Sequence, residues 1–485
     1  MIDTQAIRNK VLDLALRGKL TEQLQEDGTA EELFQQIQQE KQTFGKAGKK
    51  ANPLPPLLEK EKPYQVPENW KWVRFDEISN IIGTGLIRAG NEQFKQAKYY
   101  YFKMNNIGNF DGRCNFDNMV MVEATDDEYE KYKLEIGDFL FNTRNSKELV
   151  GKSAVVSCVP KKIILNNNIL KIRFLGGIIP EYIELFFISS QGRSQLSSFV
   201  TSTTNVAAIY QRQLITMPLP LPPLPEQHRI VERINDCFSI LDTIDALQTQ
   251  YHDNLTILKS KLIDAGIQGK LTEQLSEDGT AEELYQQIQQ EKQTLEKAGK
   301  IKKSKPLPPV SDEEKPFDIP ENWKWVRIAS LGTTTTGGTP SKDHPEYYGG
   351  NYPFFKPSDL DRGHHITKAS EYLTEFGKEA SRQLPKGSLL VCCIGSIGKC
   401  AIIDIDGTAN QQINALAPIM CDSDYLLYAI DNDAFKYQLN QGSRATTVSI
   451  INKNKFDNCI IPLPPLAEQK RIVDKLEELL PLCKG

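Results

Sequence analysis

The sequence predicts an α+β protein in which two mixed α/β domains are separated by a long antiparallel pair of helices, with the pseudo-two-fold symmetry of an internal repeat. Three observations carry this prediction. The chain contains two copies of one unit of roughly 250 residues. A long apolar stripe at helical spacing lies between two variable stretches. The two ends of the chain match opposite halves of that stripe.

The composition is typical of a soluble, cytoplasmic, multidomain protein. A length of 485 residues predicts about three domains. We find no apolar run near 18 residues and no apolar signal-peptide core at the N-terminus, so a membrane span is not expected. Nine cysteines without C-x-x-C spacing indicate reduced thiols, and five histidines leave little material for a metal site. The net charge of −5 does not indicate nucleic-acid binding, so any such function must depend on local geometry.

A frame of near-identical segments occurs twice. Residues 13–49 align with 264–300 at a constant offset of 251, with 29 of 37 positions identical. PENWKWVR occurs at 67–74 and 320–327, and LPLPPLPEQHRIVERI from Leu219 is repeated as IPLPPLAEQKRIVDKL from Ile461. The stretches between these motifs share only short segments. We infer a common mechanical role with two different recognition surfaces. Drift after duplication is the alternative, but drift would also have eroded the frame.

The repeat predicts the domain boundaries. In chain order these are an N-terminal helical segment at 1–49, a linker at 50–66, a first variable domain at 67–218, a central helical region at 219–300, a linker at 301–319, a second variable domain at 320–460 and a C-terminal helix at 461–485. The Lys- and Pro-rich linkers are expected to be extended and solvated.

A single long helix is predicted from about residue 225 to 267, because apolar residues recur there in steps of three and four and no proline follows Pro225. Such a helix is about 65 Å long, and its apolar stripe needs a partner. Residues 467–485 match 225–243, and residues 2–17 match 253–268. The two termini are therefore predicted to lie antiparallel to the central helix, the N-terminal one through Ile7, Val11 and Leu14. A homodimeric coiled coil is the alternative.

Two shorter amphipathic helices are predicted at 29–42 and 280–293, each opening with a threonine cap. Because they are copies of one another, they are our candidates for docking two copies of one partner. The apolar residues nominated for this contact are Leu33, Phe34, Ile37, Leu284, Tyr285 and Ile288.

Polar loops in the variable domains are the candidates for DNA contact. Their small donors, amides and isolated cations are the side chains that read base edges and bind phosphates, although the same residue types also dominate turns. The nominated DNA-binding residues are Lys103, Arg144, Lys152 and Thr204 in the first domain, and Lys356, Lys399, Gln412, Arg444 and Thr446 in the second.

No catalytic residue and no metal ligand is nominated. SKELVGKS at 146–153 misses the phosphate-binding pattern GxxxxGK[ST] because Ser146 stands where the first glycine is required. The sequence also lacks G-x-S-x-G, H-E-x-x-H and an NPPF/Y methyltransferase signature. We therefore expect any catalysis to belong to a partner.

The order of variable domain, long helix, variable domain and helix, with the paired PENWKWVR and PLPPLPEQHRIV or PLPPLAEQKRIV motifs and with GGTPSK and NQQINAL in the second domain, resembles the specificity (S) subunits of type I restriction–modification systems. The resemblance covers essentially the whole chain. It implies two target-recognition domains that each read one half of a bipartite site in double-stranded DNA. It also implies helices that set the spacing and dock two methyltransferase subunits and, through them, ATP-driven restriction subunits. In one respect the chain departs from the family: its second long helix stops near Gly485 and is completed by the N-terminus, as in a circularly arranged variant.

The resemblance further implies a non-catalytic subunit with no cofactor of its own, so that S-adenosylmethionine, ATP and magnesium are expected in partner subunits. Two other functional classes stay open at this stage. A two-domain protein-binding scaffold without DNA affinity would share the duplication. An ATP-using enzyme would need the loop at Ser146 to bind phosphate.

Overall fold

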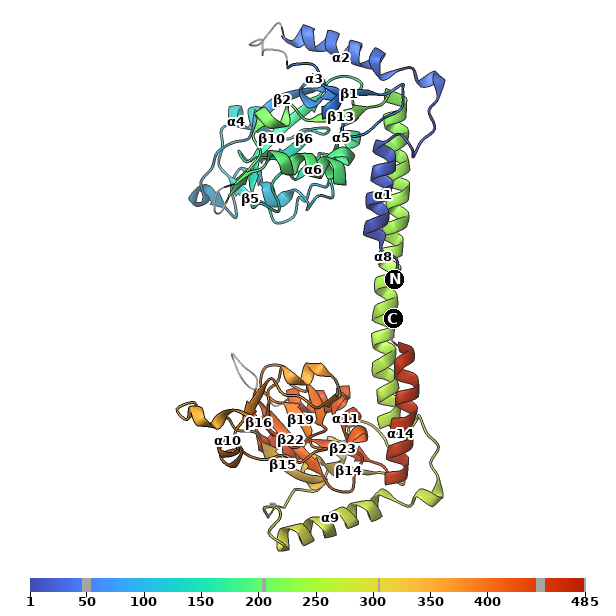
Figure 1. The fold of residues 1–485 in the computed structure, drawn as a ribbon, viewed down its shortest axis with the longest axis vertical. Coiled ribbons are helices and arrows are strands. Elements are labelled where there is room, and N and C mark those ends of the chain that lie inside the picture. The colour runs from blue at the N-terminus through green and yellow to red at the C-terminus, as the bar shows by residue number, and fades with distance from the viewer. Residues whose placement is uncertain (46–53, 203–205, 304–305, 442–449, 484–485) are drawn as a thin grey trace. The chain divides into compact units, whose positions relative to one another are not determined.

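The computed structural model describes residues 1–45, 54–202, 206–303, 306–441 and 450–483 (Figure 1). The chain divides into two compact units, Met1–Gln248 and Thr249–Gly485. The division falls inside α8 (Leu224–Ile267), a single helix of 44 residues, so each unit contains about half of it. Each unit consists of a helix pair, a short amphipathic helix, a proline-rich strap (residues 54–66 or 306–319) and a variable domain.

In the first unit, α1 (Thr4–Leu16) lies antiparallel to the first half of α8. Thr4 Oγ1 donates to Asp245 Oδ1 at 2.5 Å and Arg8 Nη2 donates to Asp242 Oδ1 at 2.9 Å, so rising numbers in α1 meet falling numbers in α8. The predicted pairing of the N-terminus with the central helix is confirmed. The buried face differs from the predicted one, since Ile7 is 40% exposed. The buried residues of α1 are Thr4, Leu12, Ala15 and Leu16.

In the second unit, α14 (Leu466–Leu479) lies antiparallel to the second half of α8, as predicted for the C-terminus. Ile472 and Leu476 are fully buried, and a Cβ added to Gly266 of α8 would lie 3.2 Å from the first and 3.3 Å from the second. Just beyond α8, Thr272 Oγ1 donates to Glu468 Oε1 at 3.1 Å, in the first turn of α14. The helices therefore run in opposite directions, and a small residue at Gly266 lets them approach closely.

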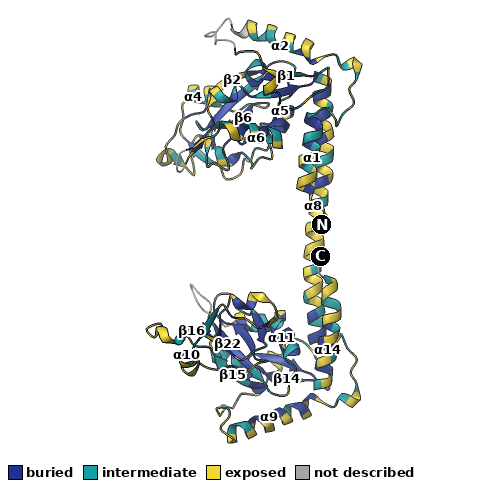
Figure 2. Ribbon diagram, in the orientation of Figure 1, coloured by how far each residue is buried: buried dark blue, intermediate teal, exposed yellow. Residues whose placement is uncertain are grey.

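The two predicted amphipathic helices are present as α2 (Ala30–Gly45) and α9 (Ala281–Lys297). Thr29 Oγ1 accepts from Glu32 N at 3.3 Å and Thr280 Oγ1 accepts from Glu283 N at 3.2 Å, which satisfies a helix N–H group that would otherwise lack a partner. Figure 2 shows buried and exposed faces alternating along each helix. The apolar face of each one packs into the core of its own unit.

The linkers were predicted to be extended and solvated, and none of their described residues is buried. They are also held to the protein as straps. Arg74 Nε donates to Pro55 O at 3.0 Å, and Arg327 Nε donates to Pro308 O at 2.8 Å. Each arginine is also ion-paired with a glutamate of its own strap, Glu61 in the first unit and Glu314 in the second. The attachment was not predicted, because a buried arginine satisfies its donors on the proline carbonyls, which composition alone does not reveal.

The opening and closing motifs of each variable domain form adjacent strands. β1 (Lys71–Arg74) pairs with β13 (Pro218–Leu221), and β14 (Lys324–Arg327) pairs with β23 (Ile460–Leu463), both antiparallel. The two ends of each variable domain are thus held side by side at the frame. Everything between them can change without moving the points of attachment.

The interior of the first variable domain is mixed α/β, as predicted. Its sheets have the strand orders β2-β10-β6-β8, β3-β5-β4-β9 and β11-β12-β7. The strands are β2 (Ser79–Thr84), β3 (Gln93–Phe94), β4 (Tyr99–Phe102), β5 (Val120–Val122), β6 (Phe139–Asn142), β7 (Arg144–Asn145), β8 (Ser153–Val155), β9 (Ile163–Leu165), β10 (Ile169–Phe174), β11 (Thr201–Ser202) and β12 (Ala207–Ala208). The helices are α3 (Phe75–Ile78), α4 (Asp126–Tyr132), α5 (Pro180–Ile188), α6 (Ser190–Phe199) and α7 (Gln211–Leu214).

The second variable domain is also mixed α/β, but its sheets differ, with orders β15-β22-β19-β20-β17 and β18-β16-β21. The strands are β15 (Gly332–Thr336), β16 (Tyr348–Phe355), β17 (His365–Ile366), β18 (Glu371–Leu373), β19 (Leu389–Cys392), β20 (Cys400–Ile403), β21 (Thr408–Ala409) and β22 (Ile413–Pro418). The helices are α10 (Glu375–Glu379), α11 (Ser423–Asp431), α12 (Asp433–Asn440) and α13 (Lys453–Asn458). Across the described part of the chain, every helix is too short or too polar to cross a membrane.

Candidate functional site

Three polar segments that are far apart in the sequence meet at one edge of the first variable domain. Thr143 N donates to Asn168 O at 2.9 Å, and Ile209 N donates to Thr143 O at 3.0 Å. Arg144 follows in β7, paired with Ala208 of β12, and is exposed. The fold therefore places Arg144 next to the paired strands β11 and β12. The nominated Thr204 lies outside the described residues.

Two nominated lysines of the first domain are engaged inside the protein. Lys152 is only 3% exposed, and its Nζ donates to Ile107 O at 2.6 Å. Burial lowers the pKa of Lys152, and its amine cannot reach DNA in this conformation, so its nomination is wrong. Lys103 is half-buried and donates to Gln93 Oε1 at 2.8 Å, which leaves it at most a partial role in contact with a ligand.

In the second variable domain the GGTPSK and NQQIN motifs lie side by side. Gly337 N donates to Ile413 O at 2.9 Å, and Gly338 N donates to Ala409 O at 2.8 Å. A Cβ at Gly337 would lie 2.1 Å from Asn410 O, so only glycine permits this approach. These contacts create one continuous polar edge from loops about 70 residues apart in the sequence.

The nominated residues of the second domain have three different outcomes. Lys399 pairs with Asp361 at 2.6 Å, and Lys356 pairs with Glu371 at 2.8 Å. Each of these lysines would have to exchange a carboxylate for a phosphate in order to bind DNA. Gln412 is partly exposed at the edge described above, where its Oε1 accepts from Asn410 Nδ2 at 3.0 Å. Arg444 and Thr446 lie outside the described residues.

Arg382 was missed by the sequence reasoning, because it belongs to none of the polar loop motifs. Its side chain is exposed, and Nη1 donates to Thr336 O at 2.6 Å, which holds the guanidinium at the GGTPSK edge. One donor is used in this contact and the rest of the planar group is available to a ligand. We add Arg382 to the candidates for DNA contact.

The paired Glu-Gln dipeptide of the PLPPLPEQ and PLPPLAEQ motifs joins each variable domain to its frame. Glu226 in the first turn of α8 is fully buried and accepts from Trp70 Nε1 at 2.8 Å, Gln23 Nε2 at 2.6 Å and Thr21 Oγ1 at 3.0 Å. Burial raises the pKa of Glu226 above its usual range, and the three hydrogen bonds act in the opposite direction. Glu468 in α14 repeats this arrangement.

The glutamine that follows each of these glutamates extends the connection into the variable domain. Gln227 Oε1 accepts from Ile179 N at 2.9 Å, just before α5. Gln469 Oε1 accepts from Asp422 N at 2.9 Å, just before α11. Both glutamines are fully buried. The orientation of each variable domain on its helix is therefore set by buried hydrogen bonds that are the same in the two units.

The residues nominated for partner docking are mostly unavailable. Four of the six are buried in the core of their own unit, namely Leu33, Ile37, Leu284 and Ile288. The other two are half-buried, with Lys71 Nζ lying 4.9 Å from the Phe34 ring and Lys324 Nζ 5.3 Å from the Tyr285 ring. The nomination is corrected accordingly, since the apolar face of an amphipathic helix was here covered by the chain itself.

A family model described as the type I restriction modification DNA specificity domain matches residues 67–251 and 320–482. Each match covers one variable domain together with the helical segment that follows it, the first part of α8 in one case and α14 in the other.

Relatives and a solved structure are similar over most of the chain. The type I restriction enzyme EcoAI specificity subunit of Escherichia coli is 26% identical over 548 residues, covering 98% of this chain and 89% of the relative. The EcoEI specificity subunit of Escherichia coli is 26% identical over 559 residues, with the same coverage of 98% and 89%. A solved structure, described as concerning complex assembly and conformational transition of the type I R-M system, has a TM-score of 0.57 at 20% identity, covering 87% of this chain and 92% of that chain. At that identity it shows a shared fold.

Proposed function

The chain belongs to the family of type I restriction–modification DNA specificity proteins, and on this premise we propose that it is the sequence-specific DNA-binding subunit of such a system. Each variable domain would read one half of a bipartite site. Methylation and ATP-dependent cleavage would belong to partner subunits, together with S-adenosylmethionine, ATP and magnesium. We place the chain in the cytoplasm, where its DNA target lies and where its nine unpaired cysteines would stay reduced.

One observation carries this proposal. The buried contacts that attach each variable domain to its helix are the same in the two units, from Trp70–Glu226 in the first to Trp323–Glu468 in the second, both at 2.8 Å. The polar edges that these contacts position are different, with exposed Arg144 in one and Arg382 beside the GGTPSK loop in the other. A protein that reads two different half-sites needs two different polar edges, each attached to its helix by the same buried contacts.

DNA binding is tested by replacing Arg144 with alanine. If this guanidinium reads a base, we expect the first half-site alone to lose discrimination, by about 1–3 kcal/mol. If it contacts a phosphate, the salt dependence of binding should weaken by about one ion without loss of discrimination. The measurement is a binding titration on target and mismatched duplexes at several salt concentrations. Lys10→Ala, an exposed lysine on α1, is the matched loss of charge and should change neither quantity. A wild-type chain without salt-dependent DNA affinity would instead favour the protein-binding scaffold.

For partner docking, the exposed polar faces of α2 and α9 replace the buried apolar faces. Gln36 and Gln287 occupy the same position in the two copies, and both are exposed. Packing within the chain does not explain their identity, because it does not constrain an exposed side chain. By contrast, the buried helix-pair positions Ala15 and Gly266 have diverged. Identity at these exposed positions, alongside divergence at a buried position of the helix pair, points to a constraint from outside the chain. We assign these two faces to two copies of one methyltransferase subunit.

Charge substitution tests the docking faces. Gln36→Lys or Gln287→Lys should each weaken one of the two methyltransferase contacts, so that native mass spectrometry detects one bound copy in place of two. Gln25→Lys is the control, because Gln25 is exposed at a position where the second copy has Ser276. Two bound copies for all three variants would remove α2 and α9 from the interface.

A further inference from the structure

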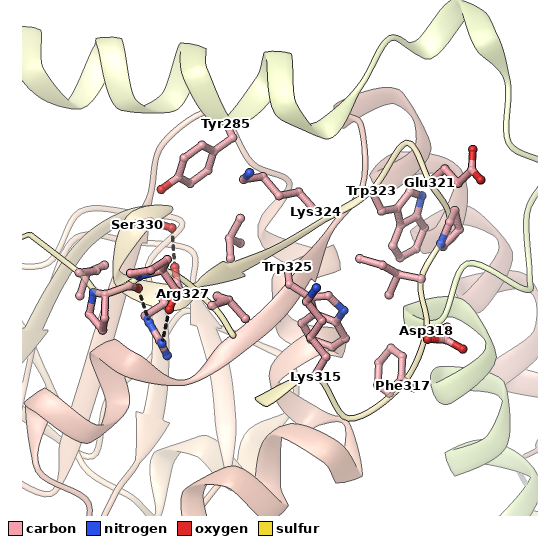
Figure 3. Close-up of a pocket in the computed structure, with 17 residues that line it drawn as sticks. Tyr285, Lys315, Phe317, Asp318, Glu321, Trp323, Lys324, Trp325, Arg327 and Ser330 are labelled. Carbon is pink, nitrogen blue, oxygen red and sulfur yellow. Dashed lines mark hydrogen bonds between the residues drawn. The ribbon is translucent and has the colours of Figure 1, made fainter. Parts of the chain in front are cut away.

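The second unit contains a cavity of about 630 Å³ between α9, the second strap and strand β14 (Figure 3). Aromatic rings form much of its wall, including Tyr285 from the helix, Phe317 from the strap and Trp325 from the strand. The Phe317 and Trp325 ring centroids are 5.0 Å apart. Asp318 and Glu321 also line the cavity, and both are exposed. Lys315, Lys324 and Arg327 line the cavity as well, and each of them is ion-paired, with Asp312, Glu282 and Glu314 respectively. The cavity therefore combines an aromatic wall with three cations that already have carboxylate partners and two carboxylates that have no ion pair among the described residues.

The first unit repeats this aromatic pair, and there the chain itself supplies a cation to it. Tyr64 and Trp72 stand at the positions of Phe317 and Trp325, with their ring centroids also 5.0 Å apart. Arg17, at the end of α1, places its guanidinium carbon 4.6 Å from the centroid of the Tyr64 ring. The guanidinium is held there by Asp13, whose Oδ1 accepts from Arg17 Nε at 2.8 Å. The aromatic pair of this frame is thus able to accept a guanidinium.

The second unit lacks the arginine that stacks on the aromatic pair of the first unit, and it has one more carboxylate beside that pair. The residue at the position of Arg17 is Gln268, whose Oε1 accepts from Lys270 Nζ at 2.6 Å. Asp318 replaces Gln65 of the first unit. Within the described residues, no lysine or arginine lies over the Phe317 or Trp325 ring, and neither Asp318 nor Glu321 has an ion pair. An aromatic wall with unpaired carboxylates at its edge is complementary to a cation from outside the chain.

We propose that this cavity receives an arginine side chain of a protein partner, which stacks on Phe317 and Trp325 and pairs with Asp318 or Glu321. Arginine suits the site better than lysine because its planar, weakly hydrated guanidinium stacks on aromatic faces while its edge donates to carboxylates. That the partner is the methyltransferase rests on the proposed function. The two units then differ in how they bind it, because only the first fills its aromatic pair from within.

The cavity is tested without a partner by ¹⁹F NMR of the full chain labelled with 5-fluorotryptophan. The chain has four tryptophans, and each gives one resonance. The probe is N-acetyl-arginine amide, and assignment is by Trp→Phe substitution. We expect the Trp325 resonance to shift on titration while that of Trp72 does not. N-acetyl-norleucine amide, which lacks the charge, should leave both unchanged. An unmoved Trp325 resonance, or equal shifts with both probes, would overturn the proposal.

Exchanging Arg17 and Gln268, the residues that distinguish the two units, tests the proposal in both directions. Gln268→Arg should fill the aromatic pair of the second unit from within and abolish the response of Trp325. Arg17→Gln should open the first unit and make Trp72 respond. Because either variant could alter local packing, Asp318→Asn combined with Glu321→Gln gives an independent test at the cavity edge and should weaken binding of the arginine probe at least fivefold. Unchanged binding in this double variant would contradict the assigned countercharges.

The partner is tested in the assembled complex. Gln268→Arg should weaken one of the two methyltransferase contacts about tenfold and leave the affinity of the chain itself for DNA unchanged. Equal methyltransferase affinity in wild type and variant would overturn the assignment of the arginine to that subunit. If the wild-type chain did not bind DNA at all, the proposed function would be wrong. That result is distinguishable from failure of the arginine assignment alone.

Discussion

Inserting four helix-forming residues after Thr249 should lengthen the spacer between the two halves of the DNA target and leave both half-sites unchanged. The insertion extends α8 by about 6 Å and by little more than one full turn, so it preserves the helix faces on either side as nearly as a short insertion can. Since base pairs are stacked about 3.4 Å apart, the spacer should grow by about two base pairs. Methylome sequencing of cells that produce the variant together with its methyltransferase measures the spacer directly.

The control for this experiment is the same four residues inserted after Lys302, in the linker that precedes the second strap. This change adds the same mass and composition without lengthening α8, so the spacer should remain that of the wild type. A spacer that is unaltered by the helix insertion, or altered equally by the linker insertion, would mean that α8 does not set the distance between half-sites.

Replacing Glu226 with alanine should destabilise the first unit by about 2–3 kcal/mol, because it removes the shared acceptor of Trp70, Gln23 and Thr21 inside the protein. Gln23 Oε1 lies 3.2 Å from Trp70 Nε1 and remains as an acceptor, which keeps the loss from being larger. Hydrogen-exchange mass spectrometry should show faster exchange over Met1–Gln248 with little change in the rest of the chain.

The second copy of the repeat offers the equivalent substitution. Glu468→Ala should produce the same loss in the second unit, where Trp323, Gln274 and Thr272 are arranged in the same way. Glu232→Ala, an exposed glutamate on the same helix as Glu226, should change stability by less than about 0.5 kcal/mol. If loss of Glu226 had no more effect than loss of Glu232, the buried carboxylate would not be what attaches the variable domain to its helix.

The architecture could be predicted from the sequence because the repeat shows which segments must pack against one another. An apolar stripe without a partner, together with two termini that match its two halves, leaves few ways to bury the surface, and both α1 and α14 lie where this reasoning places them. The detail of the interface was less accessible. Ile7 was expected to be inside and is 40% exposed, because periodicity identifies a stripe but not which of its edges faces the partner helix.

The candidate site was predicted in outline, and its individual residues were predicted less well. Loop composition selected the segments around Arg144 and the GGTPSK motif, which the structure brings to polar edges; their contact with DNA stays a prediction. Lys152 failed because the strand that follows it carries it into the interior, where a backbone carbonyl satisfies its amine. Leu33 and Leu284 failed for a related reason, since an amphipathic pattern does not specify whether a partner or the chain itself covers the apolar face. Arg382 was missed because only tertiary contact brings it to the loop.

The central claim is that each variable domain is a separate reader of one half-site, mounted on an interchangeable frame. It is tested most directly by a chain in which residues 320–460 are replaced by a second copy of residues 67–218. The strand pairs β1–β13 and β14–β23 make this junction the same in both units. Methylome sequencing should then find an inverted repeat of the first half-site, with the second half-site gone. A methylated target that still contained the second half-site would contradict the account.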